Sequence, residues 1–284
     1  MVHALTVDNF FSKYIADPFS NELSGTDKLI AVVAMSVLTL ITFSLIISLT
    51  SYLRNRTVTP ITKDSDNDQA KKVNSQALIA IQQAIVNGKN IKTIYGELDD
   101  KTRKAVTELN LKEVNATALQ LHELAEIFPC TQKLALSESS LTESHLKSLT
   151  SFKQLLALDL SVPVGSSLGL QDDSIKNLRP LFDLKMLNMN GNRGLTGTTF
   201  KLLPEALTTL FIADCRINDE GVKALSEHKL ECLALDRNKD ITGATFGSLN
   251  KALQTIHLTG CTALKAENLS ALSCKNRTLP DHIK

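Results

Sequence analysis

The feature that most constrains the fold of this 284-residue chain is an internal repeat. The pattern LxxLxL recurs with successive spacings of 25, 24, 29, 23, 23 and 23 residues. Self-similarity at a period of about 20 to 50 residues is typical of solenoids and other stacked arrays. We therefore expect one small unit to be copied and stacked. The middle aliphatic positions are Leu109, Leu134, Leu158, Leu187, Leu210, Leu233 and Ile256.

Each unit carries a short strand followed by a helix. A second aliphatic residue lies two positions after the first, and this alternation is typical of a half-buried strand. In the best units a capping residue and a helical stripe follow, as at Ile217, Asn218, Val222 and Leu225. One such unit cannot bury its own apolar face, so neighbours must stack. The predicted fold class is α/β: a solenoid with a curved parallel sheet inside and helices outside.

A resemblance to a known family rests on the residue three positions after the second aliphatic. Four consecutive units have Asn or Cys there, and Cys215 is followed by RINDEGVKAL. Residues 106–276 thus resemble a leucine-rich repeat domain of the cysteine-containing, ribonuclease-inhibitor-like subclass. In that family the Asn or Cys side chain bonds the backbone of adjacent turns, which implies a structural ladder here. The pattern fails at Val114, Ser139 and Pro163. The ladder residues are Asn192, Cys215, Asn238 and Cys261.

A second constraint is an uncharged stretch of 25 residues at 29–53. As a helix it is long enough to cross a hydrocarbon core of about 30 Å, so we predict a transmembrane helix. A cleaved signal peptide and a buried helix of a soluble domain are the alternatives, but the stretch is too long for the first and lacks the polar face of the second. More Lys and Arg follow the span than precede it, which predicts a single-pass protein with the repeats facing the cytoplasm.

The rest of the chain is divided by composition. Residues 1–28 form an N-terminal tail with a candidate interfacial helix, and 54–73 form a polar, flexible linker. Residues 74–105 have helical patterns that predict a cap on the repeats, and 277–284 form a C-terminal tail.

The sequence contains no recognisable catalytic or cofactor motif. The six histidines are dispersed, and no GxGxxG, GxxxxGK[ST], GxSxG or HExxH occurs. We therefore predict no enzyme activity, no cofactor and no metal. The glycine-rich Gly191–Gly197 segment is in register with the repeat, so we interpret it as a turn and not as a phosphate loop. With 31 basic against 30 acidic residues, the net charge of +1 gives no overall electrostatic field that would attract nucleic acid, so we predict no nucleic-acid partner.

The open sheet is the surface that a partner could reach. Side chains flanking the buried aliphatics point to the concave face, because side chains alternate along a strand. Phe211 and Met186 stand there among small and polar residues, which favours either an interface hot spot or simple mutual packing. A Pro-, Gly- and Ser-containing insertion at 162–169 is a second candidate edge. The predicted partner-binding residues are Asp159, Met186, Asn188, Asn190, Phe211, Asp236 and His257.

These observations favour a non-enzymatic protein-interaction module, a scaffold or adaptor anchored in a membrane. The whole arrangement resembles membrane-anchored repeat proteins of intracellular bacteria. Two alternatives remain open: a GTPase-activating regulator of the ribonuclease-inhibitor-like type, and a self-associating structural scaffold. The sequence does not determine the oligomeric state.

Overall fold

The computed structural model describes residues 81–85, 87, 91, 98–166 and 169–283. The chain divides into two units, 1–63 and 64–284, and all described residues lie in the second. The predicted tail 1–28, transmembrane helix 29–53 and linker 54–73 lie outside the described residues. Within the described part, no helix is long and apolar enough to cross a bilayer.

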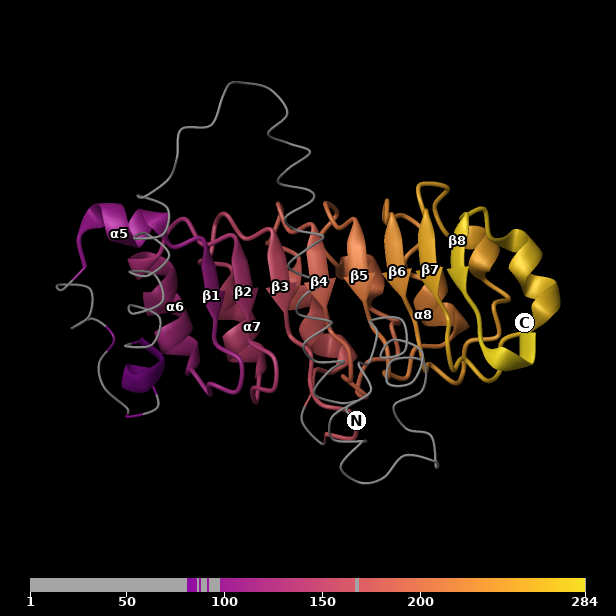
Figure 1. Cartoon of the computed structure of the whole chain (residues 1–284), viewed down its shortest axis with the longest axis horizontal. Coiled ribbons are helices and arrows are strands. Elements are labelled where there is room, and N and C mark those ends of the chain that lie inside the picture. The colour runs from indigo at the N-terminus through magenta and orange to yellow at the C-terminus, as the bar shows by residue number, and fades with distance from the viewer. Residues whose placement is uncertain (1–80, 86, 88–90, 92–97, 167–168, 284) are drawn as a thin grey trace, which may run out of the picture. The chain divides into compact units, whose positions relative to one another are not determined.

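The described part is built on one parallel sheet whose eight strands follow chain order (Figure 1). The register aligns the middle positions of neighbouring strands, as in Leu109 with Leu134 and Leu210 with Leu233. All seven predicted strands are therefore confirmed. The strands are β1 (Glu108–Asn110), β2 (Lys133–Ala135), β3 (Ala157–Asp159), β4 (Met186–Asn188), β5 (Thr209–Phe211), β6 (Cys232–Ala234), β7 (Thr255–His257) and β8 (Asn276–Thr278).

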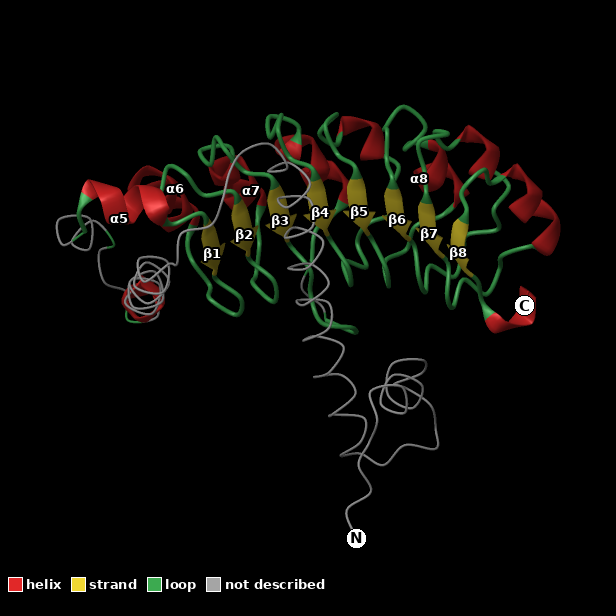
Figure 2. Cartoon of the chain, turned by 45° about the horizontal axis from the view of Figure 1, so that its top comes forward, coloured by secondary structure: helices red, strands yellow, loops and turns green. Residues whose placement is uncertain are grey.

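Helical segments cover one face of this sheet, on the outside of its curve (Figure 2). The units with periods of 24 and 25 residues carry α-helices of seven and ten residues, whereas two of the 23-residue units carry 3₁₀ turns of only three. A shorter period leaves fewer residues for the return path. The segments are α5 (Asp100–Ala105), α6 (Ala118–Ile127), α7 (Glu143–Leu149), η1 (Asp172–Leu178), η2 (Phe200–Leu202), α8 (Asp219–Lys223), η3 (Phe246–Ser248), η4 (Ala266–Ala271) and η5 (Asp281–Ile283).

The core lies between the sheet and these helices. The middle aliphatic of every strand from β1 to β7 is at most 1% exposed. Three fully buried aromatic rings, Phe128, Phe200 and Phe246, fill the space on the helical side. Burial on this scale is the main stabilising contribution, and no single unit could supply it alone.

The two ends of the solenoid are finished differently. At the first end Ile81 and Ile91 are fully buried, and Gln82 Nε2 donates to the Asn110 carbonyl at 2.7 Å, beside β1. At the other end the repeat continues past residue 276, because β8 contains Arg277 and Thr278, which lie in the predicted C-terminal tail. The sequence pattern missed β8 because Arg277 occupies the position where the other strands have an aliphatic residue. The Arg277 guanidinium instead donates to the carbonyls of Leu269, Leu272 and Cys274 at 2.5–3.1 Å. It thereby provides hydrogen-bond donors for these backbone carbonyls of the last turn.

Candidate binding surface on the concave face

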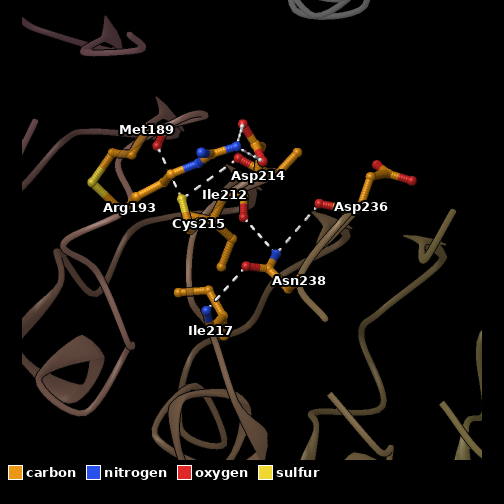
Figure 3. A network of polar contacts seen from close by, with 9 residues as sticks. Met189, Arg193, Ile212, Asp214, Cys215, Ile217, Asp236 and Asn238 are labelled. Atoms are coloured by element: carbon orange, nitrogen blue, oxygen red, sulfur yellow. Dashed lines mark hydrogen bonds and ion pairs between the residues drawn. The ribbon is translucent and has the colours of Figure 1, made fainter. Parts of the chain in front are cut away.

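The internal ladder lies beneath the concave face and holds successive turns together. Asn192 Nδ2 donates to the Leu160 and Met189 carbonyls at 3.0 and 2.8 Å, and its Oδ1 accepts from the Leu170 N–H at 2.7 Å. Asn238 makes the same bonds two units later, to Ile212, Leu235 and Ile217 (Figure 3). Both amides are fully buried, so they satisfy backbone groups that water cannot reach.

The two cysteines of the ladder alternate with the asparagines. The Cys215 thiol donates to the Met189 carbonyl at 3.4 Å, and the Cys261 thiol donates to the Leu235 carbonyl at 3.3 Å. Burial raises the pKa of each thiol to about 12. Since the thiolate is the reactive form, these thiols are unreactive, and a structural role follows.

One earlier unit also has a bonded side chain at the ladder position, two units before Asn192, with Pro163 between them. Ser139, where the Asn or Cys pattern fails, is buried and donates from Oγ to the Val114 carbonyl at 3.1 Å.

The position just before the ladder residue adopts positive φ in six units, at Glu113, Glu138, Gly191, Asp214, Arg237 and Gly260. The third unit is the exception: it has Val162 there, and a β-branched residue strongly disfavours this conformation. The Val162 carbonyl occupies the place of a Cβ at Gly191, so only glycine fits there.

Four of the predicted partner-binding residues hold the turns at the carboxyl ends of the strands. The side-chain oxygens of Asp159 and Asn188 each accept the N–H two residues later, at 2.9 and 3.1 Å. Asn190 and Asp236 accept instead from the next unit, from Ala213 N–H at 2.7 Å and Thr259 N–H at 2.8 Å. These side chains therefore have structural partners, whatever else they bind.

The remaining three predicted residues differ in exposure. Met186 is only 5% exposed, so it offers almost no surface to a partner, although the sequence pattern placed it on the open face. Phe211 and His257 are half-buried. Phe211 is in register with Asn188 on one side and Ala234 on the other, so Met186 is its diagonal neighbour and not its direct one. The Nδ1 of His257 is 3.1 Å from Thr278 Oγ1.

Charge is distributed unevenly over the concave face. In the first two units each lysine of the concave face has an acidic partner: Lys112 Nζ is 2.9 Å from Glu138, and Lys133 Nζ is 3.4 Å from Glu108. From β3 to β7 the concave positions carry Asp159 and Asp236 but no lysine or arginine. Burial raises the pKa of both aspartates, and hydrogen bonds with Ser161 and Asn188 oppose the shift at Asp159, as the charge of His257 does at Asp236.

On the helical side, two aspartate carboxylates accept hydrogen bonds from the next unit, and we call these contacts carboxylate clasps. They were not predicted from the sequence. The Asp172 carboxylate accepts from the Thr196 N–H, the Thr196 hydroxyl and the Gly197 N–H of the next unit. Asp219 binds Thr242 and Gly243 in the same way, with the Gly243 N–H at 3.0 Å. Both receiving segments read TG, at 196–197 and 242–243, and that shared dipeptide was the available signal. These bonds also confirm that Gly191–Gly197 is a repeat turn.

The described residues offer little for catalysis. Among them, no group of three or more His, Cys, Asp or Glu side chains could hold a metal ion. Burial raises the pKa of Cys232, the half-buried thiol of the concave face, to about 11. What the face does present is an open, mostly uncharged sheet with one aromatic ring near its centre.

Comparison with known proteins adds structural neighbours only. No protein-family model matches the chain, and no curated protein matches it in sequence. Among solved structures, it is similar to the leucine-rich repeat-containing protein LegL7 of Legionella pneumophila, with 20% identity, a TM-score of 0.49, and coverage of 68% of this chain and 70% of that one.

It is also similar to TLR13, solved as a complex with ssRNA13, again with 20% identity and a TM-score of 0.49. That match covers 65% of this chain but only 27% of the TLR13 chain, so this chain spans about a quarter of TLR13's length. The parallel sheet and repeat register of this chain have the architecture of a leucine-rich repeat α/β solenoid.

Proposed function

We propose that this protein is a binding scaffold that presents the concave face of its repeats to a protein partner while residues 29–53 anchor it in a membrane. The observation that carries the proposal is Phe211, a half-exposed aromatic ring near the middle of an open sheet whose neighbouring polar groups are already bonded to turns. Aromatic residues surrounded by fixed polar groups are typical hot spots of protein interfaces. The Asn and Cys ladder supports the ribonuclease-inhibitor-like subclass as the finer description.

In this proposal the concave binding surface is held rigidly by the hydrogen bonds beneath it. The ladder amides and the strand-end hydrogen bonds hold the concave side chains in place, so binding costs little ordering entropy. In this scheme the linker at 54–73 lets the solenoid reach partners near the bilayer, and the excess of basic residues after the span directs it to the cytoplasm.

A pull-down from the native cell tests the concave face. We expect Phe211→Ala in the full chain to reduce partner capture about tenfold or more, because truncating a hot-spot residue costs about 2 kcal/mol or more. Phe182→Ala is the matched control: Phe182 is 77% exposed, lies in the loop before β4, and is not a concave position. Equal capture by the Phe211 variant and the unmodified chain would contradict the proposal.

A fractionation experiment tests the anchor. The full chain should stay with membranes after alkaline extraction, and a variant lacking residues 29–53 should be released. Proximity labelling from the C-terminus then reports the side: labelling of cytoplasmic proteins agrees with the proposed orientation, and labelling of proteins from the opposite side contradicts it.

A further inference from the structure

Two consecutive helices of the solenoid begin with the same hydrogen-bonded cap but use different acceptors. Before α6, the Thr117 N–H donates to Gln120 Oε1 at 2.8 Å. Before α7, at the same place in the next repeat, the Thr142 N–H donates to His145 Nδ1 at 3.0 Å. Both are capping boxes, in which the third helical residue bonds the backbone of the capping residue. An amide oxygen does not titrate, whereas an imidazole changes its charge between pH 5 and pH 8.

The bond from Thr142 fixes the protonation state of His145. A backbone N–H can only donate, so Nδ1 must offer its lone pair, and the proton of the neutral ring lies on Nε2. The Thr142 hydroxyl is also close, with Oγ1 2.7 Å from Nδ1. A second proton on the ring goes to Nδ1. The hydroxyl can then reverse its role and accept, but the N–H cannot, so the ring and the backbone face each other as two donors.

A positive charge is unfavourable at this end of α7. The N-terminus of a helix is the positive end of its dipole, so a cation in the first turn opposes the helix. Glu143, the acidic residue of this turn, is already paired with Lys147 at 3.0 Å, and Lys147 and then Lys176 of η1 lower the pKa of its carboxyl. The elements packed against α7 are α6 and η1. Their other ionisable side chains are His122, Glu123 and Glu126 on α6 and Asp172 and Asp173 on η1.

We propose that His145 is a pH-sensitive cap of α7. In mild acid the half-exposed imidazole takes up a proton from solvent, releases the Thr142 N–H and loosens the first turn of the helix. The cap of α6 keeps its bond, because Gln120 has no proton to gain. The device lies on the helical side of the second repeat, so it is separate from the proposed concave binding surface.

Hydrogen exchange measured by NMR tests this cap, with the full chain in detergent micelles. The exchange rate of the Thr142 amide is measured from pH 8 to pH 5 and compared with the intrinsic rate at each pH, which gives its protection. We expect this protection to fall about fivefold, because a helix cap changes helix stability by about that factor. Thr117 is the internal control and should keep its protection. Constant protection at Thr142, or an equal loss at Thr117, would overturn the proposal.

Two substitutions identify the group that titrates. His145→Gln gives α7 the acceptor that α6 has, so the protection of Thr142 should no longer depend on pH. His122 is the matched control, because it is the imidazole at the other end of α7: its Nδ1 is 2.7 Å from Ser151 Oγ, and its Nε2 is 3.6 Å from Glu126. His122→Gln should leave the pH response of Thr142 unchanged. A response that survives in His145→Gln, or one that disappears in His122→Gln, would assign the titration to another group and refute the proposal.

Discussion

The first two repeats and the last full ones achieve the same stacking by different means. Behind β1 and β2 stand the α-helices α6 and α7, and α6 begins with a capping box in which Thr117 and Gln120 bond each other's backbone. The ladder position there holds Val114 and Ser139 and provides a single side-chain bond.

Behind β4 to β7 the helical segments shorten, and polar clasps take over. Buried Asn and Cys side chains bond the adjacent turns, Asp219 bonds the next unit, and Gly197 and Gly221 approach each other closely. Units with a period of 24 or 25 residues have room to stack through helix packing, whereas the stacking of units with a period of 23 depends on specific hydrogen bonds. Removal of one such side chain should therefore lower the free energy of unfolding more in the C-terminal units than in the first two.

The largest expected effect is at the ladder. Asn238→Ala leaves the Ile212 carbonyl and the Ile217 N–H without these partners and removes one of the donors to the Leu235 carbonyl, so we expect a loss of about 3 kcal/mol in the free energy of unfolding. Ser139→Ala at the equivalent position removes one bond and should cost about 1 kcal/mol. Urea unfolding of the full chain measures both. Equal losses would break the distinction between the two regions.

The close glycine contact comes next. A Cβ at Gly221 would collide with the Thr196 carbonyl and lie 3.0 Å from Gly197 Cα, so Gly221→Ala should destabilise the fold by about 2 kcal/mol. Gly247→Ala is a matched control in η3, because its Cβ would meet only the Ala271 methyl at 3.7 Å. We expect that change to lie within about 0.5 kcal/mol of zero. Thermal unfolding of the two variants would show whether close backbone approach matters here.

The clasps give an intermediate effect. Asp219→Ala removes the acceptor for the Thr242 and Gly243 N–H groups, and bonds to a charged acceptor contribute about 1.5–3 kcal/mol. We expect a loss near the lower end, with faster hydrogen exchange at those two amides. The exposed Asp240→Ala should change neither property. Unaltered exchange in the Asp219 variant would show that the clasp is dispensable.

The smallest effect concerns a buried charge, and it has the opposite sign. Burial raises the pKa of the Asp159 carboxyl, so its contribution to stability is full below the unfolded-state pKa and is lost as pH rises through the folded-state pKa. Asp159→Asn keeps the acceptor for the Ser161 N–H, so it should stabilise the fold at pH 7 by about 0.5–2 kcal/mol. The difference in melting temperature from the unmodified chain should shrink as the pH falls through the folded-state pKa. A variant less stable at pH 7 would contradict this reasoning.

The sequence was sufficient for the frame of this protein because the frame is periodic. Leu158 and Leu210 belong to the core by their place in the repeat, and the resemblance to leucine-rich repeats implied that Asn192 and Cys215 belong to one ladder. Such positions follow from alternation along a strand, a local property that any stacked unit must satisfy. Arg277 broke the aliphatic pattern of the strands, and β8 was missed there.

The candidate site was only partly predictable, because several of its hydrogen bonds join residues more than twenty positions apart. Nothing local to Asn190 or Asp236 shows that Ala213 and Thr259 donate to them, so residues that seemed free to bind a partner proved to be fixed to turns. Met186 likewise has a concave position by alternation, yet it is almost fully buried.

The amino-acid sequence by itself determined the unit, its period, its strands and its ladder, because each follows from the order of apolar and polar residues within about two dozen positions. The tertiary structure alone decided which concave side chains remain available to a partner and which glycines lie in close contact with a neighbouring unit. It also decided how Arg277 bonds the backbone carbonyls at the last strand. Those features depend on how far neighbouring units approach one another, and that distance is set by the packing of the whole stack.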